Sequence, residues 1–131
     1  TNRWKARCLM ASTKFQRGQI WEVELEPQSH KEEPGKRKRP ALVIQTDLLN
    51  ASCHPTTIVV VGTSQVRRDK DYFPLRVALP SQAGLPLDTD LLIDQVRAIS
   101  NRRFVGDQPL SKLNTSQLQR VEDALKLLMG K

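Results

Sequence analysis

The fold class of this chain is set by one stretch, Gln19-Ile20-Trp21-Glu22-Val23-Glu24-Leu25-Glu26. Its apolar residues at positions 21, 23 and 25 alternate with glutamates, which is the period-two pattern of a strand with one buried face. Pro27 follows and ends the strand, because proline has no N–H to donate to a sheet. We therefore expect a half-buried β-strand at this place, with Trp21 on its core side.

Four further segments have the pattern of β-strands. Residues 40–46 and 57–62 are short apolar runs rich in β-branched side chains, which predicts two largely buried strands. Residues 73–79 alternate again, but a proline inside the run removes a hydrogen-bond donor and favours an edge position. Residues 91–99 predict one or two short strands around a polar pair. The polar, charged segment 28–38 is typical of a long loop.

The last predicted element is an amphipathic helix. Its apolar residues recur at helical spacing and are Leu118, Val121, Leu125 and Leu128. Asn114 is a candidate N-cap with Gln117 three residues later, and Gly130 is a stop signal. Short strands followed by one helix predict a mainly β chain of the α+β class, a small antiparallel barrel with a C-terminal helix.

The length of 131 residues predicts one domain. Residues 17–131 hold all the predicted elements, whereas residues 1–16 have no clear period and are an ordered extension, a flexible arm or a cloning remnant. No apolar run is long enough to span a membrane and no secretory signal is visible, so we expect a cytoplasmic protein. Cys8 and Cys53 lack metal-site spacing and are expected to be reduced thiols.

The net charge of +7 is unevenly distributed. Five basic residues and no acidic ones lie in the first 17 positions, which leaves 16 basic against 14 acidic residues in the rest of the chain. Local clusters are therefore more informative than the sum. Three of them could line a phosphate-binding groove, although each of them taken alone is more typical of a solvated loop: residues 36–39, residues 67–70 and the pair Arg102-Arg103.

Familiar catalytic signatures such as GxSxG, HExxH and the P-loop are absent from the sequence. Arg39 lies where the charged loop enters a buried strand, and its planar guanidinium can donate two hydrogen bonds to a phosphate. Thr63 follows Gly62 at the end of another buried strand, where a hydroxyl can face a ligand. The alternatives are an arginine that solvates a strand end and an ordinary turn threonine.

Five blocks of sequence, in this order, resemble the MazF/PemK/Kid family of toxin–antitoxin endoribonucleases. They are Arg17-Gly-Gln-Ile-Trp21, Glu26-Pro27, Arg39-Pro-Ala-Leu-Val-Ile-Gln45, Pro55-Thr-Thr-Ile-Val59 leading to Thr63, and Asp94-Gln-Val-Arg-Ala-Ile99. With the expected helix, they cover residues 17 to about 129. Each block alone would be weak, but the shared order and spacing make the resemblance specific.

The resemblance implies the plasmid-maintenance toxin fold shared by CcdB and PemK, a homodimeric SH3-like barrel. It implies cleavage of single-stranded RNA, in particular mRNA, without metal or other cofactor, which leaves a 2′,3′-cyclic phosphate and a 5′-hydroxyl. It also implies growth arrest through blocked translation, and a MazE-like antitoxin as partner. Because RNA supplies its own 2′-hydroxyl nucleophile, the enzyme needs only proton transfer and a cationic cradle.

Mapped residue by residue, the resemblance makes Arg39 and Thr63 the catalytic pair. Asp94 and Gln95 match a pair that reads RNA bases in relatives, and Arg97 is a candidate for RNA or dimer contacts. The loop contributes further RNA-binding candidates, which are His30, Lys36, Arg37 and Lys38.

The sequence departs from the family pattern in the loop and in one strand. Segment 28–38 is longer and more basic than usual, which leaves the alignment of His30 open. Leu92 stands where the Kid branch has an arginine, which favours a mechanism closer to MazF. Two alternatives remain open: a CcdB-like gyrase poison without enzymatic activity, and an SH3-like nucleic-acid-binding module.

Overall fold

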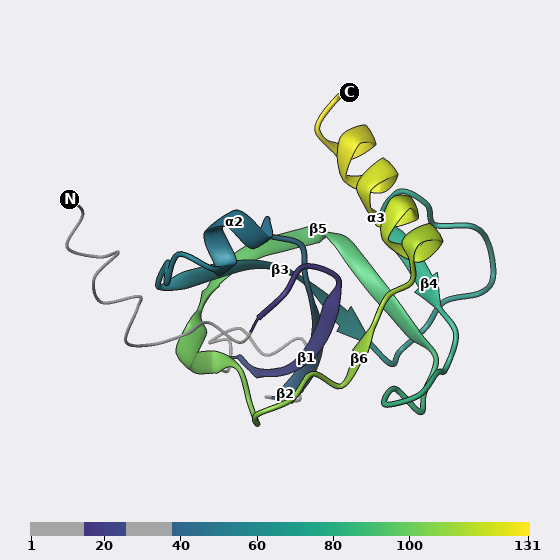
Figure 1. Ribbon diagram of the computed structural model, residues 1–131. Coiled ribbons are helices and arrows are strands. Elements are labelled where there is room, and N and C mark those ends of the chain that lie inside the picture. Colours follow the sequence, from purple (N-terminus) through teal and green to yellow (C-terminus); the bar gives the residue numbers. More distant parts are fainter. Residues whose placement is uncertain (1–14, 26–37) are drawn as a thin grey trace.

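A computed structural model describes residues 15–25 and 38–131 of the chain. In these residues the chain forms one six-stranded sheet with the order β4-β5-β3-β2-β1-β6, and the neighbouring strands pair antiparallel (Figure 1). The strands are β1 (Gln19–Glu24), β2 (Lys38–Val43), β3 (Thr56–Thr63), β4 (Arg76–Leu79), β5 (Thr89–Ser100) and β6 (Ser111–Lys112). The helices are α2 (Asp47–Asn50), the 3-10 turn η1 (Asn101–Arg103) and α3 (Thr115–Leu128).

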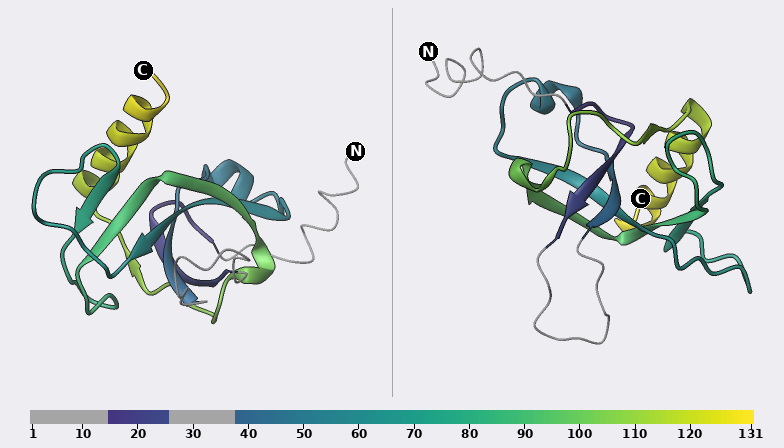
Figure 2. Two further views of the ribbon diagram at one scale, coloured as in Figure 1. Left: turned by 180° about the vertical axis from the view of Figure 1, so that it is seen from behind. Right: turned by 90° about the horizontal axis from the view of Figure 1, so that it is seen from below.

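The sheet curls because the chain returns to β1 after β5. Phe104 forms an isolated bridge with Val23, and the Val105 N–H donates to the Glu22 carbonyl at 2.8 Å. The long, bent β5 and the short β6 therefore enclose β1 and β2, as the two further views show (Figure 2). This curled half-barrel with a C-terminal helix confirms the predicted fold class.

Both faces of the central strands are buried. One face, with Leu42 and Val60, packs toward Val121 and Ala124 of α3. The other face lies inside the curl, where Phe15 stacks on Phe104 at 3.9 Å between ring centroids and meets Trp21 edge-on at 5.2 Å. Double-sided burial explains why these strands are continuous apolar runs.

The C-terminal helix forms as its sequence predicts. The Asn114 side chain accepts from the Gln117 N–H at 2.8 Å, and the Gln117 side chain accepts from the Asn114 N–H at 3.0 Å, which completes a capping box. Glu122 forms an ion pair with Arg17, which joins the helix to the start of β1. No helix within residues 15–25 and 38–131 is long and apolar enough to cross a membrane.

Two predictions, those for segment 73–79 and for Cys53, need correction, and the structure describes two other segments more fully. Segment 73–79 is a strand only from Arg76, because residues 73–75 form a turn around Pro74, although β4 does lie at the sheet edge. Residues 91–99 belong to one continuous strand, β5, with a register shift opposite Val60 and Gly62. The segment between β2 and β3, for which the sequence predicts no element, contains the short helix α2. Cys53 is disulfide-bonded and not a reduced thiol, while Cys8 lies outside the described residues.

Candidate active site

A pocket of about 420 Å³ opens at the ends of β2 and β3. Arg39 from β2 and Thr63 from β3 both line it. The two residues lie far apart in sequence, so the sheet alone brings them to one place. The opposite wall is apolar and comes from the loop before β5 and the segment before β6: Leu85, Pro86, Leu87 and Leu110.

A close approach of two backbones positions Arg39 and Thr63. A Cβ on Gly62 would lie 2.8 Å from Thr89 Cγ2 and 3.3 Å from Pro40 Cγ, so only glycine fits without displacement. Pro40 and Gly62 therefore pack directly on each other. Because Arg39 and Thr63 are their neighbours in sequence, this contact sets where the two side chains begin.

The apolar wall depends on another close approach. Gly84 has a φ of +82°, a conformation that favours glycine, and a Cβ built on it would lie 1.6 Å from the Leu110 carbonyl oxygen. The loop before β5 is thus pressed against the chain that leads into β6. Gln82 adds a hydrogen bond from its side-chain amide to the Ser111 hydroxyl at 2.7 Å. These contacts fix the wall relative to the sheet.

The Thr63 hydroxyl is held by the loop that follows it. Its oxygen accepts from the Gln65 N–H at 3.1 Å, which leaves the hydroxyl proton available to a ligand. The Gln65 carbonyl in turn accepts from the Arg76 guanidinium at 3.1 Å. The loop between β3 and β4 is therefore tied to β4 immediately beside the pocket.

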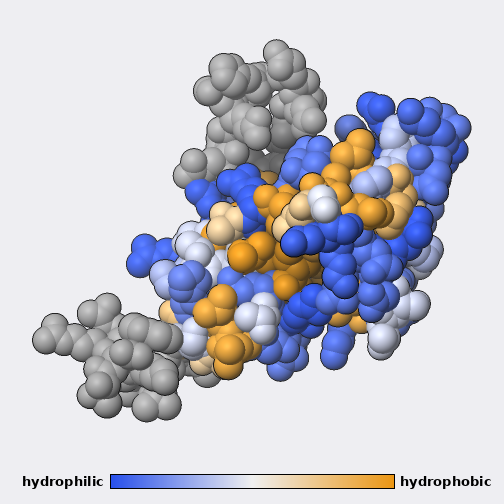
Figure 3. All heavy atoms as spheres, turned by 90° about the horizontal axis from the view of Figure 1, so that it is seen from above, coloured by the Kyte–Doolittle hydropathy of each residue, from blue (hydrophilic) through white to orange (hydrophobic). Residues whose placement is uncertain are grey.

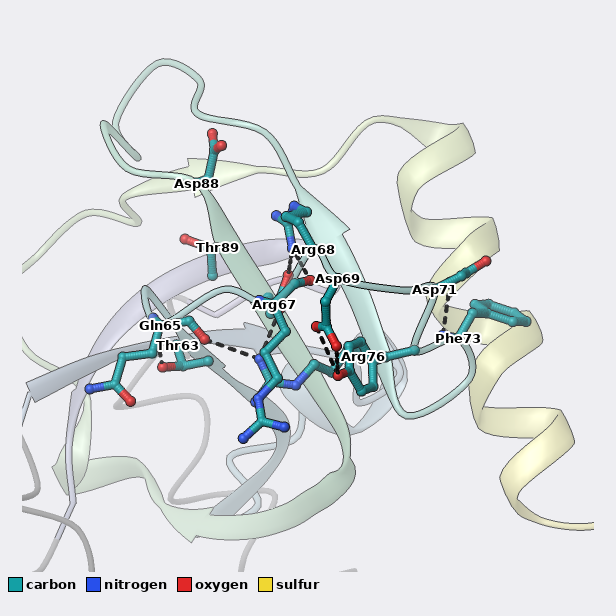
Figure 4. A network of polar contacts seen from close by, with 12 residues as sticks. Thr63, Gln65, Arg67, Arg68, Asp69, Asp71, Phe73, Arg76, Asp88 and Thr89 are labelled. Carbon is teal, nitrogen blue, oxygen red and sulfur yellow. Dashed lines mark hydrogen bonds and ion pairs between the residues drawn. The ribbon is translucent and has the colours of Figure 1, made fainter.

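That tie leads to a buried carboxylate, Asp90, which is 1% exposed. Asp90 accepts from Arg68 at 2.7 Å, from Arg76 at 2.9 Å and from the Arg67 N–H at 3.0 Å, and Figure 4 shows these arginines gathered beside Thr63 and Gln65. Burial by itself would raise the pKa of Asp90. The Arg67 N–H and the two guanidiniums outweigh it and hold that pKa below its ordinary value.

The structure places the predicted site residues in three groups. Lys38 lines the same pocket as Arg39 and Thr63. Asp94, Gln95 and Arg97 are exposed on β5, outside the lining of this pocket. The remaining candidates lie outside the described residues, namely His30, Lys36 and Arg37.

Glu22 also lines the pocket, and sequence reasoning missed it. It faces Pro40 across the β1–β2 pair and is half-buried. The alternation of β1 indicates only that Glu22 lies on the other face of the strand from Trp21, where a solvated glutamate is ordinary. The pairing of Glu22 with Pro40, the residue after Arg39, is what places Glu22 at the pocket. This pairing depends on how two strands align and cannot be read from the sequence of β1 alone.

The described part of the chain contains no group of three histidine, cysteine, aspartate or glutamate side chains arranged to hold a metal ion. The pocket instead offers a guanidinium, an ammonium, a hydroxyl and a carboxylate, from Arg39, Lys38, Thr63 and Glu22. Such a set can bind a phosphate, stabilise added negative charge and accept a proton.

Comparison with known proteins gives a family and a fold. The model of the family described as PemK-like, MazF-like toxin of type II toxin–antitoxin system matches residues 16–129. A curated relative, endoribonuclease MazF9 of Mycobacterium tuberculosis (strain ATCC 25618 / H37Rv), is 30% identical over 118 residues, which cover 86% of this chain and 94% of that protein.

Solved structures have the same fold. MazF from Deinococcus radiodurans superposes with a TM-score of 0.67 at 24% identity, covering 89% of this chain and 97% of that one. The Mycobacterium tuberculosis toxin MazF-mt6 gives a TM-score of 0.66 at 16% identity, over 86% of this chain and 96% of its own. An endoribonuclease from a mycobacterial species, solved in complex with its cognate antitoxin, gives 0.64 at 18% identity and covers 88% and 95%.

Proposed function

Because the chain belongs to the family of PemK-like, MazF-like toxins of type II toxin–antitoxin systems, we propose that Arg39 and Thr63 are the catalytic pair of an endoribonuclease that cuts single-stranded RNA. The family membership confirms the resemblance inferred from the five sequence blocks. The observation that supports the assignment of roles is the shared pocket, to which β2 and β3 each contribute one of the two residues.

The proposed reaction is an internal transesterification. The ribose 2′ oxygen attacks the adjacent phosphorus, the bond from phosphorus to the 5′ oxygen breaks, and the products are a 2′,3′-cyclic phosphate and a 5′-hydroxyl. Arg39 clamps the phosphate oxygens and stabilises the departing 5′ oxygen, which takes its proton from water. Thr63 donates a hydrogen bond to the charge that builds up on phosphorus. Positioning and electrostatics of this kind supply most of the rate in phosphate chemistry.

Glu22 is the group in the pocket that can take the 2′ proton. A carboxylate is an effective general base when it is within reach of the proton and ionised at the working pH. Glu22 lines the pocket at the position opposite Pro40, next to Arg39. We assign it the base role, with Lys38 adding positive charge at the mouth of the same pocket.

RNA recognition is assigned to the exposed residues of β5 and to the candidates His30, Lys36 and Arg37, which lie outside the described residues. Asp94, Gln95 and Arg97 can present carboxylate, amide and guanidinium groups to unstacked bases. On the same strand Val96 is 40% exposed, and Ile58 of β3, which pairs with Ala98, is 39% exposed. Figure 3 shows apolar residues gathered in the centre of one face with hydrophilic residues around them. An exposed apolar area supports the proposed homodimer.

The proposed partner is an antitoxin of the MazE type. The solved relatives include a MazE–MazF complex from Deinococcus radiodurans and a mycobacterial endoribonuclease with its cognate antitoxin. A disordered, acidic antitoxin segment that folds on binding would complement the basic residues of this chain and cover the pocket. Both proteins would act in the cytoplasm, where mRNA is translated.

Cleavage of RNA in excess EDTA tests the proposed function. Purified protein is expected to cut single-stranded RNA and to leave 5′-hydroxyl ends, which sequencing of the new ends would map. Arg39→Ala and Thr63→Ala are each expected to lower the cleavage rate at least ~100-fold while circular dichroism stays unchanged. Retained activity in both variants would refute the assigned roles, and inhibition of gyrase without RNA cleavage would refute the function itself.

The base role of Glu22 has a separate test. Glu22→Gln is expected to lower kcat about 100-fold with little change in KM, because the variant has no carboxylate to accept the 2′ proton. Glu24→Gln is the matched control, since Glu24 is exposed on the same strand and does not line the pocket. An unchanged kcat in Glu22→Gln would assign the 2′ proton to another group.

A further inference from the structure

A second cavity, lined mainly by basic side chains, lies beside the pocket that contains Thr63. Its volume is about 300 Å³, and Tyr72 and Asp90 are part of its lining. The basic residues around it are Arg67, Arg68, Lys70, Arg76 and Arg120. Five basic residues against the carboxylates of Asp69, Asp71 and Asp90 leave this region with an excess of positive charge. The proposed cleavage chemistry uses none of these residues.

Two of the five cations belong to the fold. The Asp90 carboxylate pairs with Arg68 at 2.7 Å and with Arg76 at 2.9 Å, and its side chain is 1% exposed. Arg76 also donates to the Gln65 carbonyl. Since these contacts neutralise the buried carboxylate and fasten the loop, Arg68 and Arg76 are not free to bind a ligand without breaking the network.

Arg67 and Lys70 are differently placed. Within residues 15–25 and 38–131 neither side chain pairs with a carboxylate, and both lie over the Tyr72 ring, at 5.9 Å for the Arg67 guanidinium and 5.0 Å for the Lys70 ammonium. The ring itself is held by its hydroxyl, which donates to Asp69 at 2.9 Å. An aromatic face stabilises a cation without cancelling its charge. The two cations are therefore positioned but still available to an anion.

An RNA strand bound at Thr63 would pass the second cavity. Asp90 is the cross-strand partner of Thr63, so their side chains leave the sheet on the same face. Arg67 follows Thr63 closely in sequence, and Figure 4 shows Thr63 and Gln65 next to it. A nucleic acid that places one phosphate at Thr63 thus has its neighbouring phosphates within this region.

We propose that Arg67 and Lys70 bind a phosphodiester group of the RNA strand that flanks the cleaved one. This inference rests on the proposed RNA cleavage at Arg39 and Thr63. Phosphate is the expected ligand because Arg67 and Lys70 lie together over one ring, and guanidinium matches the oxygen geometry of phosphate. A contact to the backbone adds affinity and sets the register of the strand without reading its sequence.

The test is binding of RNA across a series of salt concentrations, using an oligonucleotide that carries a 2′-deoxy sugar at the cut position and is therefore not cleaved. Fluorescence anisotropy would give the affinity of the wild type, Arg67→Gln, Lys70→Gln and the double variant. Lys126→Gln is the matched control, because it removes one positive charge from an exposed position of α3 that lines neither cavity.

Each single variant is expected to bind about three- to tenfold more weakly near ~0.1 M salt. The slope of log affinity against log salt is expected to become shallower by about 0.7 for each phosphate that is no longer neutralised, as counterion release predicts for single strands. Lys126→Gln is expected to keep the wild-type slope. The sequence preference of cleavage should stay the same in all variants, since the phosphate interaction does not read bases.

Two results would overturn the inference. One is a wild-type affinity and salt slope in the double variant. The other is unchanged RNA binding together with weaker binding of the antitoxin, which would make the second cavity a protein-binding site. The binding assay does not depend on cleavage, so the two proposals can fail separately. If the wild type does not cleave RNA, the proposed function is contradicted. The binding of the variants to RNA then still decides whether Arg67 and Lys70 hold a phosphate.

Discussion

Removing the Asp90 carboxylate tests whether the buried network holds the loop beside the pocket. Asp90→Ala deletes an acceptor of three hydrogen bonds, from the Arg67 N–H and the guanidiniums of Arg68 and Arg76. The Arg68 side chain is 46% exposed and can be hydrated again, whereas Arg76 is 21% exposed and loses its counterion in a more buried place. Breaking a fully buried pair costs roughly 3–5 kcal/mol, so with one partner half exposed we expect about 2–4 kcal/mol.

Urea unfolding followed by the fluorescence of the buried Trp21 would measure this loss as a lower midpoint at an unchanged m-value. For a chain of this length the melting temperature should fall by about 10 °C. Asp123→Ala is the control, because Asp123 is exposed and accepts one side-chain hydrogen bond, from Gln119. A loss below about 1 kcal/mol in Asp90→Ala would refute the reasoning.

The same variant predicts how stability depends on pH. The pKa of Asp90 is lower in the folded chain than in the unfolded one, so the unfolded chain binds the proton more readily. The stabilisation is therefore fully present above the ordinary aspartate pKa and is lost as the pH falls through the lower folded value. The difference in unfolding free energy between wild type and Asp90→Ala should be constant near neutral pH and shrink below about pH 4.

Two further substitutions test how the pocket and the helix are built. Gly62→Ala places a methyl group 2.8 Å from Thr89 and 3.3 Å from Pro40. We expect a loss of about 1–3 kcal/mol in the free energy of urea unfolding, together with slower RNA cleavage. Full stability and activity would show that Gly62 is not tightly packed against its neighbours. Asn114→Ala removes the cap of α3 and should cost about 1 kcal/mol, whereas Asn114→Ser should retain most of it, and equal losses in both would contradict the capping box.

The sequence predicts the elements whose pattern is local. The strand β1, which ends at Glu24, the apolar runs of β2 and β3, and the capped helix α3 are all found in the structure. The prediction of a strand at residues 73–75 is wrong because these residues alternate as a strand does but form a turn. A strand also needs hydrogen bonds to a neighbouring strand, and the sequence pattern does not show whether such a neighbour is present. Helix α2 has four residues, which is too short for a helical period to be detected.

The candidate site is only partly predictable from the sequence, because some of its residues are identified only by the residues they pair with on neighbouring strands. Arg39 and Thr63 could be singled out because each lies at the end of a buried strand and matches a family block. Glu22 and Asp90 could not be, because their significance comes from cross-strand partners, Pro40 for one and Thr63 for the other. Period-two alternation gives the face of a side chain but does not identify its neighbour on the next strand.

The contact of Gly84 with the Leu110 carbonyl also constrains how this toxin can evolve. The apolar wall of the pocket joins two segments on either side of β5, and there is no room between them for a longer side chain. Inserting residues into the loop is expected to push the wall away from Arg39 and Thr63 and to slow the proposed cleavage. Exchanges of the side chains at Pro86 and Leu87 are therefore expected to be tolerated better than changes in the length of this loop.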